Sequence, residues 1–443
     1  MNGGLSMVEM KSGYKMTEVG VIPEDWEVKN VSESCLIKAR IGWQGLKKSE
    51  YMSSGDYLLI TGTDFDNGQV NWKSCAYVSK ARYEQDSNIK IRPQDILISK
   101  DGTIGKVAYL GMIPKAGTLN SGIFVIRAND RKIDQVFLSK IFMSFYFEDF
   151  LNRLVAGSTI NHLYQKDFVK FCFPLPNSEE QAAIAAALSD VDSLISALIK
   201  KIEKKKAIKQ GLMQQLLTGR KRLPGYEKNR ESVQTEWGAI PKDWKTLSIG
   251  KCCSIKARIG WQGLKKSEYL STGEYVLVTG TDFLNGRIDW KSCVYVSKNR
   301  YEQDANIQIV KHDILITKDG TIGKVAFLDD VPCLGTLNSG IFVVRSHSEE
   351  LDQCYLSKIF GSFIFDAFLE SLVAGSTINH LYQKDFVHFN FPVPPTISEQ
   401  TAIANILSDC DSEIAALEEK RDKYKEIKQG MMQQLLTGKI RLI

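Results

Sequence analysis

Residues 37–51 read IKARIGWQGLKKSEY, and the same letters return at residues 255–269. The same shift of 218 positions (from 37 to 255) aligns further blocks: KDGTIGK at 100–106 with 318–324, GTLNSG at 117–122 with 335–340, and VAGSTINHLYQKDFV at 155–169 with 373–387. Near Pro395 the shift becomes 219, which aligns QQLLTG at 214 with QQLLTG at 433. Solenoid repeats are only about 20–50 residues long. The chain is therefore a duplicated domain.

The composition is that of an ordinary globular protein. Apolar residues make up 43% and charged residues 25% of the 443 positions. Nine cysteines without a Cys-x-x-Cys pair favour reduced thiols in a cytosol. No apolar run reaches the ~20 residues of a membrane span, and residues 1–15 do not read as a secretory signal. We expect a cytoplasmic protein without a membrane span, and the net charge of +5 points only weakly to nucleic acid.

The first part of each repeat has the pattern of a mixed α+β module. Short alternating runs predict strands in the first copy at residues 57–61, 95–99, 106–110 and 123–127. Asp-Asn-Gly at 66–68 and Asp-Gly at 101–102 predict turns. An amphipathic stretch at 135–155 predicts one helix.

The second part of each repeat has the pattern of a long helix. Ser178, followed by Glu180 and Gln181, predicts the helix cap, and Gly219 and Gly438 predict the two helix ends. Apolar residues alternate by four and three along one seam of the first helix: Ile184, Leu188, Val191, Ile195, Leu198, Ile202, Leu212 and Leu216. The second helix carries a matching seam, so we expect the two helices to pair. An antiparallel coiled coil would relate the halves by a pseudo-twofold axis.

Four motifs in this order resemble the specificity (S) subunits of type I restriction-modification systems. TEVGVIPEDW at 17–26 opens the first repeat and is echoed by TEWGAIPKDW at 235–244. DGTIGK and GSTINHL follow, and then a Pro-x-Pro entry to a long helix that ends in QQLLTG. The resemblance covers almost the whole chain apart from roughly the first 15 residues.

The resemblance implies an α+β fold with two target-recognition domains separated by two long helices, which form an antiparallel coiled coil with a pseudo-twofold relation. The expected limits are 1–173 for recognition domain 1, 174–222 for spacer helix 1, 223–391 for recognition domain 2 and 392–443 for spacer helix 2. It also implies a non-catalytic subunit that reads double-stranded DNA, docks two methyltransferase (M) subunits and joins nuclease/translocase (R) subunits. The chain itself would hold no cofactor, and S-adenosylmethionine, magnesium and ATP are expected only in the partner subunits.

The near identity of the two modules departs from the family, whose two recognition domains commonly differ. If one reading surface is used twice about a twofold axis, the target is an interrupted inverted repeat, because operator symmetry mirrors protein symmetry. Two alternatives stay open: a specificity subunit of a related restriction or defence system, and a coiled-coil scaffold whose heads do not bind DNA. A nuclease or methyltransferase is disfavoured, since the only Pro-Pro, at 394–395, is followed by Thr396 rather than an aromatic residue.

The basic and polar residues of the repeated blocks are the candidate DNA contacts, because lysine and arginine hold phosphates and arginine and glutamine fit base edges. The alternatives are a solvated loop at 37–51, a hairpin turn at 100–106 and a helix cap at 157–162. The candidates in module 1 are Arg40, Gln44, Lys47, Lys48, Lys100, Lys106, Asn120, Ser158, Thr159, Asn161, His162 and Lys166. Their counterparts in module 2 are Arg258, Gln262, Lys265, Lys266, Lys318, Lys324, Asn338, Ser376, Thr377, Asn379, His380 and Lys384.

A run of lysines on the first predicted helix has two interpretations. A solvated face is the simpler one, and contact with spacer DNA or an acidic partner is the other. The run comprises Lys200, Lys201, Lys204, Lys205, Lys206 and Lys209.

Overall fold

The computed structural model describes residues 12–155, 162–227, 231–373 and 380–442. The chain divides into two compact units. Unit 1 holds Met1–Ile199 and Glu419–Ile443, and unit 2 holds Lys200–Glu418. Each unit therefore combines one sheet-rich module with the beginning of one long helix and the end of the other. The long helices are α6 (Ser178–Leu216) and α12 (Ile397–Leu435).

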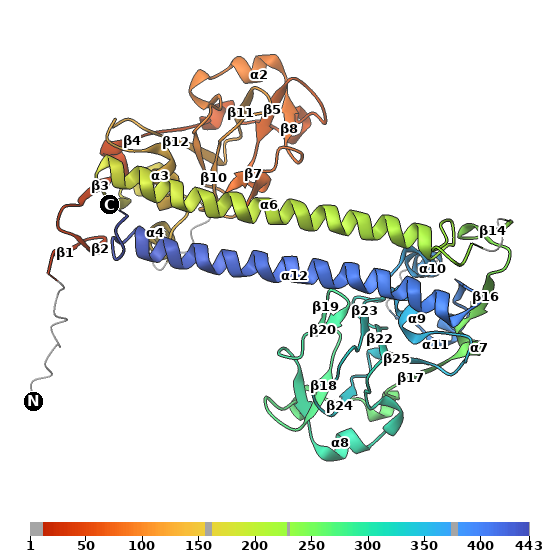
Figure 1. The fold of residues 1–443 in the computed structure, drawn as a ribbon. Helices are drawn as coiled ribbons and strands as arrows, with labels where there is room; N and C mark the ends of the chain where they lie inside the picture. The colour runs from red at the N-terminus through yellow and green to blue at the C-terminus, as the bar shows by residue number, and fades with distance from the viewer. Residues whose placement is uncertain (1–11, 156–161, 228–230, 374–379, 443) are drawn as a thin grey trace, which may run out of the picture. The chain divides into compact units, whose positions relative to one another are not determined.

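Two sheets form the centre of module 1 (Figure 1). The larger sheet is antiparallel, with the order β10-β9-β12-β4 (Val107–Tyr109, Ile96–Ser99, Ile123–Ala128, Cys35–Ala39). The smaller has the order β11-β5-β8 (Gly117–Leu119, Tyr57–Ile60, Ala76–Val78), with β11 parallel to β5. The four predicted strands match β5, β9, β10 and β12 to within one residue at each end, so these predictions are confirmed.

Short elements complete module 1. A hairpin of β6 and β7 turns at Asn67 and Gly68, which both have positive φ, as the Asp-Asn-Gly sequence predicted. The other strands are β1 (Tyr14–Thr17), β2 (Gly20–Pro23), β3 (Glu27–Asn30), β6 (Phe65–Asp66), β7 (Gln69–Val70) and β13 (Cys172–Leu175). The helices are α1 (Val31–Ser34), α2 (Lys80–Glu84), α3 (Gln135–Phe142), α4 (Phe145–Val155) and α5 (Gln165–Phe168).

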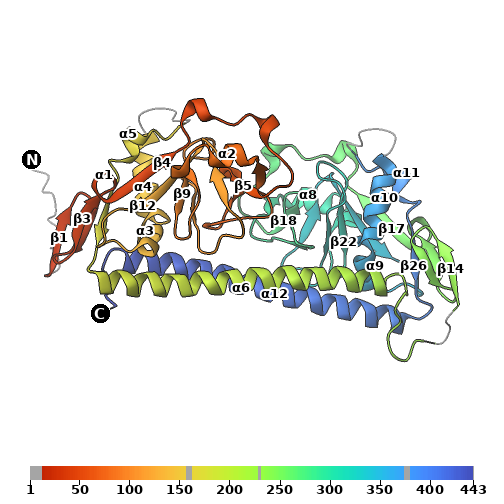
Figure 2. The ribbon, with the colours of Figure 1, turned by 90° about the horizontal axis from the view of Figure 1, so that it is seen from above.

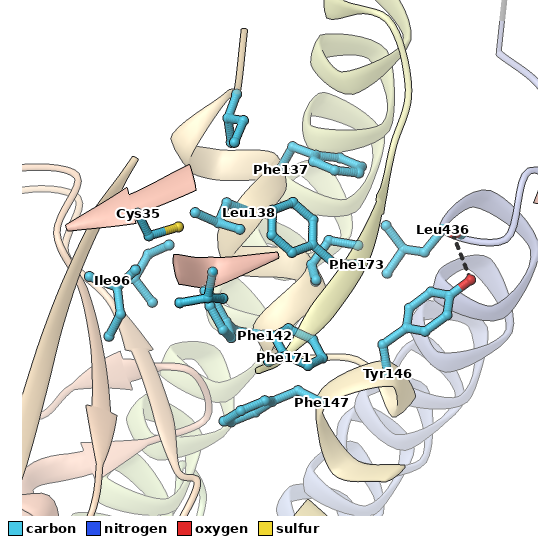
Figure 3. Packing of buried hydrophobic residues seen from close by; sticks show 14 of the residues in the cluster. Cys35, Ile96, Phe137, Leu138, Phe142, Tyr146, Phe147, Phe171, Phe173 and Leu436 are labelled. Atoms are coloured by element: carbon cyan, nitrogen blue, oxygen red, sulfur yellow. Dashed lines mark hydrogen bonds between the residues drawn. The ribbon is translucent and has the colours of Figure 1, made fainter. Parts of the chain in front are cut away.

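Strand β9 is buried on both faces because it separates two hydrophobic cores. Successive strand residues point to opposite faces of a sheet. Ile96 and Ile98 accordingly join the core formed with the helices, and Leu97 joins the core between the two sheets. The helix-side core also receives Leu436, whose carbonyl accepts a hydrogen bond from Tyr146 at 3.3 Å (Figure 3).

Module 2 repeats this arrangement. Its larger sheet has the order β17-β25-β22-β23 (Cys253–Ala257, Ile341–Ser346, Ile314–Thr317, Val325–Phe327). Its smaller sheet has the order β21-β18-β24 (Val294–Val296, Tyr275–Val278, Gly335–Leu337). The remaining strands are β14 (Ser232–Thr235), β15 (Gly238–Pro241), β16 (Lys245–Ser248), β19 (Phe283–Leu284), β20 (Arg287–Ile288) and β26 (Asn390–Val393). The helices are α7 (Ile249–Cys252), α8 (Lys298–Glu302), α9 (Gln353–Phe360), α10 (Phe363–Val373) and α11 (Gln383–Phe386).

The predicted helix at 135–155 is wrong in one respect, because two helices occupy that stretch. Helix α3 ends at Phe142, and α4 begins at Phe145. Between them the buried Ser144 hydroxyl donates to the carbonyl of Ile141 at 2.6 Å and accepts from the amide of Tyr146. A serine that satisfies backbone groups in this way competes with the helical pattern and redirects the chain.

The helix halves within each unit run antiparallel. In unit 1 the start of α6 lies beside the end of α12 (Figure 1), where Asp192 pairs with Lys428 at 2.7 Å. In unit 2 Lys205 pairs with Glu413 at 2.7 Å and Lys209 with Asp411 at 2.5 Å. The coiled-coil fold class predicted from the two seams is confirmed in this form.

The apolar seam and the lysine run each divide between two environments. Ile184 and Leu188, at the start of the seam, are part of the module 1 core, together with Met432 and Leu435 of α12. Three of the lysines, Lys205, Lys206 and Lys209, form ion pairs with α12. The others, Lys200, Lys201 and Lys204, are exposed. A uniformly solvated lysine face is therefore not what the structure has.

The helix ends follow the glycine prediction, whereas the helix start differs from it. Asn177, not Ser178, caps α6, because its side-chain oxygen accepts from the Glu180 amide at 2.9 Å. Gly219 and Gly438 have φ of +65° and +67° just beyond the helices. Glycine is needed at Gly438 for a second reason, since a Cβ there would lie 2.4 Å from Pro23.

Of the described helices, α6 has the length and composition of a membrane span. Its apolar residues have partners inside unit 1, where Ile184 and Leu188 are fully buried. Asp192, in the same stretch, pairs with Lys140 and Lys428. We therefore assign this stretch as a core helix.

Candidate nucleic-acid interface

Three of the repeated blocks meet in module 1. The Asn120 amide group donates to the Tyr51 hydroxyl at 2.5 Å, which joins the end of the 37–51 block to the 117–122 block. The Lys100 backbone amide donates to the carbonyl of Gly122 at 2.8 Å, which adds the 100–106 turn. Module 2 repeats the first of these contacts between Asn338 and Tyr269 at 2.8 Å. Residues distant in sequence thus form one loop cluster in each module.

The segment that begins at His162 joins the same cluster. The His162 side chain forms a hydrogen bond with Asp101, and the Leu163 amide donates to the Lys100 carbonyl at 2.8 Å. Helix α5, just after His162, lies on the side of module 1 away from α6, and α11 lies likewise away from α12 (Figure 2). The part of the loop cluster that adjoins α5 or α11 is therefore on the face of each module away from the long helices.

The 100–106 block is a strand-turn-strand, the simpler of its two interpretations. It connects β9 and β10, which pair antiparallel, and Gly102 and Gly105 both have positive φ. The turn nevertheless carries two of the candidate cations. Lys106 is exposed, and the Lys100 ammonium lies 5.1 Å from the centre of the Phe124 ring.

Arg40 and Gln44 are buried inside the cluster, although the sequence suggested them as DNA contacts. Arg40 is 2% exposed and donates to Leu119 O, Thr118 Oγ1 and Gln85 Oε1. Burial lowers the pKa of its guanidinium. Gln44 is 6% exposed, and its amide oxygen has no hydrogen-bond partner in the described structure. Arg258 and Gln262 are buried in the same way in module 2.

From its buried position, Arg40 stabilises the backbone of the 37–51 block through a chain of side-chain contacts. Its partner Gln85 also accepts from Arg82, and Arg82 pairs with Glu50 at 2.6 Å. Glu50 in turn accepts from the Lys47 backbone amide at 2.8 Å. This chain of contacts fixes the backbone that carries Lys47 and Lys48. Direct DNA contact by Arg40 would require its guanidinium to leave all three partners.

Arg40→Met provides a test of this supporting role. We expect a loss of about 1–3 kcal/mol in the free energy of unfolding, because the Leu119 carbonyl and Thr118 hydroxyl lose their donor inside the protein. Urea denaturation measures this change, and hydrogen exchange should show faster exchange in residues 42–51. The same change at Arg258 is the matched variant for module 2. Unchanged unfolding combined with lost DNA binding would instead assign Arg40 to the DNA contact.

The exposed candidates are mainly lysines. Lys47, Lys48, Lys106 and Lys166 are exposed in module 1, whereas Lys100, Asn120 and His162 are half-buried. In module 2 Lys265, Lys266 and Lys384 are exposed, and Lys318, Lys324, Asn338 and His380 are half-buried. The remaining candidates lie outside the described residues: Ser158, Thr159, Asn161, Ser376, Thr377 and Asn379.

Two side chains at the cluster escaped sequence reasoning. Tyr164 is 56% exposed, its ring lies 4.6 Å from that of His162, and the Lys166 ammonium lies 5.6 Å from it. Tyr382 repeats these contacts. The sequence feature that could have revealed Tyr164 and Tyr382 was the alternation of histidine, tyrosine and lysine in the repeated block. Asp101 was the second omission, since only the structure shows its bond to His162.

Sequence differences between the modules, such as Gln69 against Arg287 and Lys170 against His388, lie outside these contacts. Gln69 lines a cleft of about 740 Å³ between module 1 and the helices α6 and α12 in unit 1. Arg287 lines a cleft between module 2 and the same two helices in unit 2. Lys170 pairs with Asp167 at 3.0 Å. The residues that build the loop cluster are the same in the two modules.

Comparison with known proteins gives a family for this repeated architecture. The profile of the type I restriction modification DNA specificity domain matches residues 23–210 and again residues 241–429. The chain belongs to the type I restriction-modification DNA specificity family. Specificity subunits of these systems are recognition subunits rather than enzymes, and they serve DNA-directed complexes with other subunits.

Relatives match along nearly the entire chain. The putative type I restriction enzyme MjaX specificity subunit of Methanocaldococcus jannaschii is 28% identical over 439 residues, which cover 98% of this chain and 97% of the relative. The MjaVIII specificity subunit of the same organism is 27% identical over 430 residues, covering 95% and 94%. The crystal structure of the type I S subunit from M. genitalium shares the fold, with a TM-score of 0.60, 15% identity and coverage of 96% and 99%.

Proposed function

We propose that each module of this specificity subunit reads one half of an interrupted DNA site with its loop cluster. The observation that carries the proposal is the position of the exposed lysines. Lys47 and Lys48 are exposed on the 37–51 block and Lys166 is exposed on α5, and module 2 has the same set. Positive side chains around a polar, semi-rigid loop surface suit phosphate contacts on either side of a groove.

We further propose that the target is an inverted repeat. The residues that form the cluster are the same in both modules, so both should read the same bases. Each unit contains the start of one helix and the end of the other. This exchange is what antiparallel helices produce, and we propose that the two half-sites are accordingly read in opposite directions.

The helices are proposed to dock two methyltransferase subunits, with nuclease/translocase subunits joining the complex. S-adenosylmethionine, magnesium and ATP would be bound by those partners. The support for docking is the exposed surface of α6. It includes Lys200, Lys201 and Lys204, which are accessible to a partner subunit.

Methylation mapping of the host genome by long-read sequencing tests these proposals together. With the gene present, we expect one modified motif made of two inverted copies of the same half-site separated by unspecified bases. The motif should disappear when the gene is deleted and return when it is restored. A gene-dependent motif with two unrelated half-sites contradicts the inverted repeat but keeps the specificity function, whereas no gene-dependent motif contradicts the function itself.

A further inference from the structure

Asp101 and His162 form a pair in module 1 that Asp319 and His380 repeat in module 2. The Asp101 carboxylate bonds His162 Nδ1, and the backbones of the two residues form an isolated β-bridge. The side chains are 44% and 33% exposed in module 1, and 43% and 30% in module 2. Both backbone and side chain therefore hold the pair together, and its polar edge remains open to solvent.

The carboxylate determines which ring nitrogen carries the histidine proton. An ionised carboxylate only accepts hydrogen bonds, so its bond to Nδ1 places the proton on that nitrogen. The other nitrogen of the neutral ring, Nε2, is then an acceptor. The second oxygen of Asp101 is an acceptor as well. The pair thus offers two acceptors within a cluster whose other exposed groups are mainly lysine donors.

Acceptors distinguish among the bases of a DNA major groove. The donors presented there are the N6 amino group of adenine and the N4 amino group of cytosine. Guanine presents its N7 and O6 acceptors, and thymine presents O4 and a methyl group. Phosphates repel a carboxylate but attract the neighbouring Lys47, Lys48 and Lys166. The lysines are therefore suited to the backbone, and the Asp–His pair is suited to a base edge.

We propose that the two Asp–His pairs read an amino-bearing base, adenine or cytosine, at one position in each half-site. His162 and His380 contact the base, and Asp101 and Asp319 are positioning residues that set the histidine tautomer. The proposal rests on the proposed DNA-reading function and adds the chemistry of one contact. Since the pair is the same in both modules, the base is the same in both half-sites.

Selection from a randomised duplex pool tests the pair with the purified full-length chain. The asparagine of Asp101→Asn can donate to Nδ1, which releases the Nδ1–H tautomer. We expect the preference for one base pair over the others to fall by about three- to tenfold at one position of one half-site, the size of a single hydrogen bond. His162→Ala should remove the preference at that same position. The total affinity for unrelated duplex should not change.

The second module and a carboxylate on the β6–β7 hairpin provide the controls. Asp319→Asn should alter the preference at the other half-site only. Each variant therefore keeps one unaltered module, whose half-site should be selected as it is by the wild-type chain. Asp66→Asn removes an exposed carboxylate from the β6–β7 hairpin and should leave the motif unchanged.

The outcomes separate this inference from the function on which it rests. An enriched motif that both Asp101→Asn and His162→Ala leave unchanged, or weaken equally at every position, overturns the base-reading role. If the wild-type chain enriches no motif, the proposed function fails instead.

Discussion

We expect replacement of Lys47, Lys48, Lys265 and Lys266 by glutamine to lower the affinity for duplex DNA by roughly a hundredfold to a thousandfold near physiological salt. Each phosphate contact releases counterions and contributes about 0.9 to the slope of log affinity against log salt. Loss of four contacts therefore reduces the slope by about 3.6. Fluorescence anisotropy with a labelled duplex, repeated over a range of salt concentrations, measures both quantities. The size of the effect follows from the exposure of these lysines and the rigid backbone beneath them.

A control with the same change in net charge tests whether position or total charge matters. Lys15, Lys29, Lys242 and Lys245 lie on β1, β3 and β16 and beside β15, outside the loop cluster. Their replacement by glutamine removes the same four charges. We expect a change in the salt slope of less than about one contact. Equal loss of affinity in both variants would show that long-range attraction, rather than the loop cluster, accounts for binding.

The fold could be predicted largely from the repeat and the hydrophobic patterns. Strands such as Ile96–Ser99 have β-branched residues bounded by turn residues, and this local pattern is sufficient to predict the strand. The break at Ser144 was missed because the amphipathic pattern continues across it. A single side-chain hydroxyl bonding two backbone groups leaves no periodic signal.

The candidate site was harder to predict because its side chains are sorted by tertiary contacts. Arg40 and Lys47 are both cations in the same repeated block, yet one is buried by partners at 85, 118 and 119 and the other is exposed. The Asp101–His162 pair joins residues 61 positions apart. Sequence identity between the copies preserved all of these residues equally, so it could not separate supporting residues from surface residues.

The seams predicted that the helices pair and the family resemblance implied the antiparallel direction, but the contacts that fix the helix ends left no pattern in the sequence. The deciding contacts are polar and specific to the helix ends. Arg441, just beyond α12, binds Glu180 at the start of α6 and Asp25 before β3, and its guanidinium carbon lies 5.7 Å from the Trp26 ring. Arg222 makes the corresponding contacts with Glu399, Asp243 and Trp244 in unit 2. In each unit, an arginine that follows the long helix of one repeat thus binds acidic residues of the other repeat.

Arg441→Met should destabilise unit 1 by about 3–5 kcal/mol, because removal of one partner leaves a buried charge without compensation. Glu180 is 0% exposed, and Arg441 donates to both of its carboxylate oxygens. The Trp26 indole, at 3.0 Å, would be its remaining side-chain donor among the described contacts. Urea denaturation gives the energy, and hydrogen exchange should show the loss in residues 419–438. Lys439→Met, which removes a neighbouring exposed charge, should have little effect on either measurement.

The double variant Arg441→Met with Glu180→Leu separates the ion pair from simple packing. Replacing a whole buried ion pair by apolar side chains is often neutral, whereas breaking it is costly. We therefore expect Glu180→Leu to recover much of the stability that Arg441→Met removes, with a coupling energy of at least about 1 kcal/mol in a double-mutant cycle. Additive losses would mean that Arg441 acts through its stacking on Trp26. Recovery would show that the charge on Glu180 makes the arginine necessary, so that a buried carboxylate at the start of one helix enforces the closure of each unit by the other repeat.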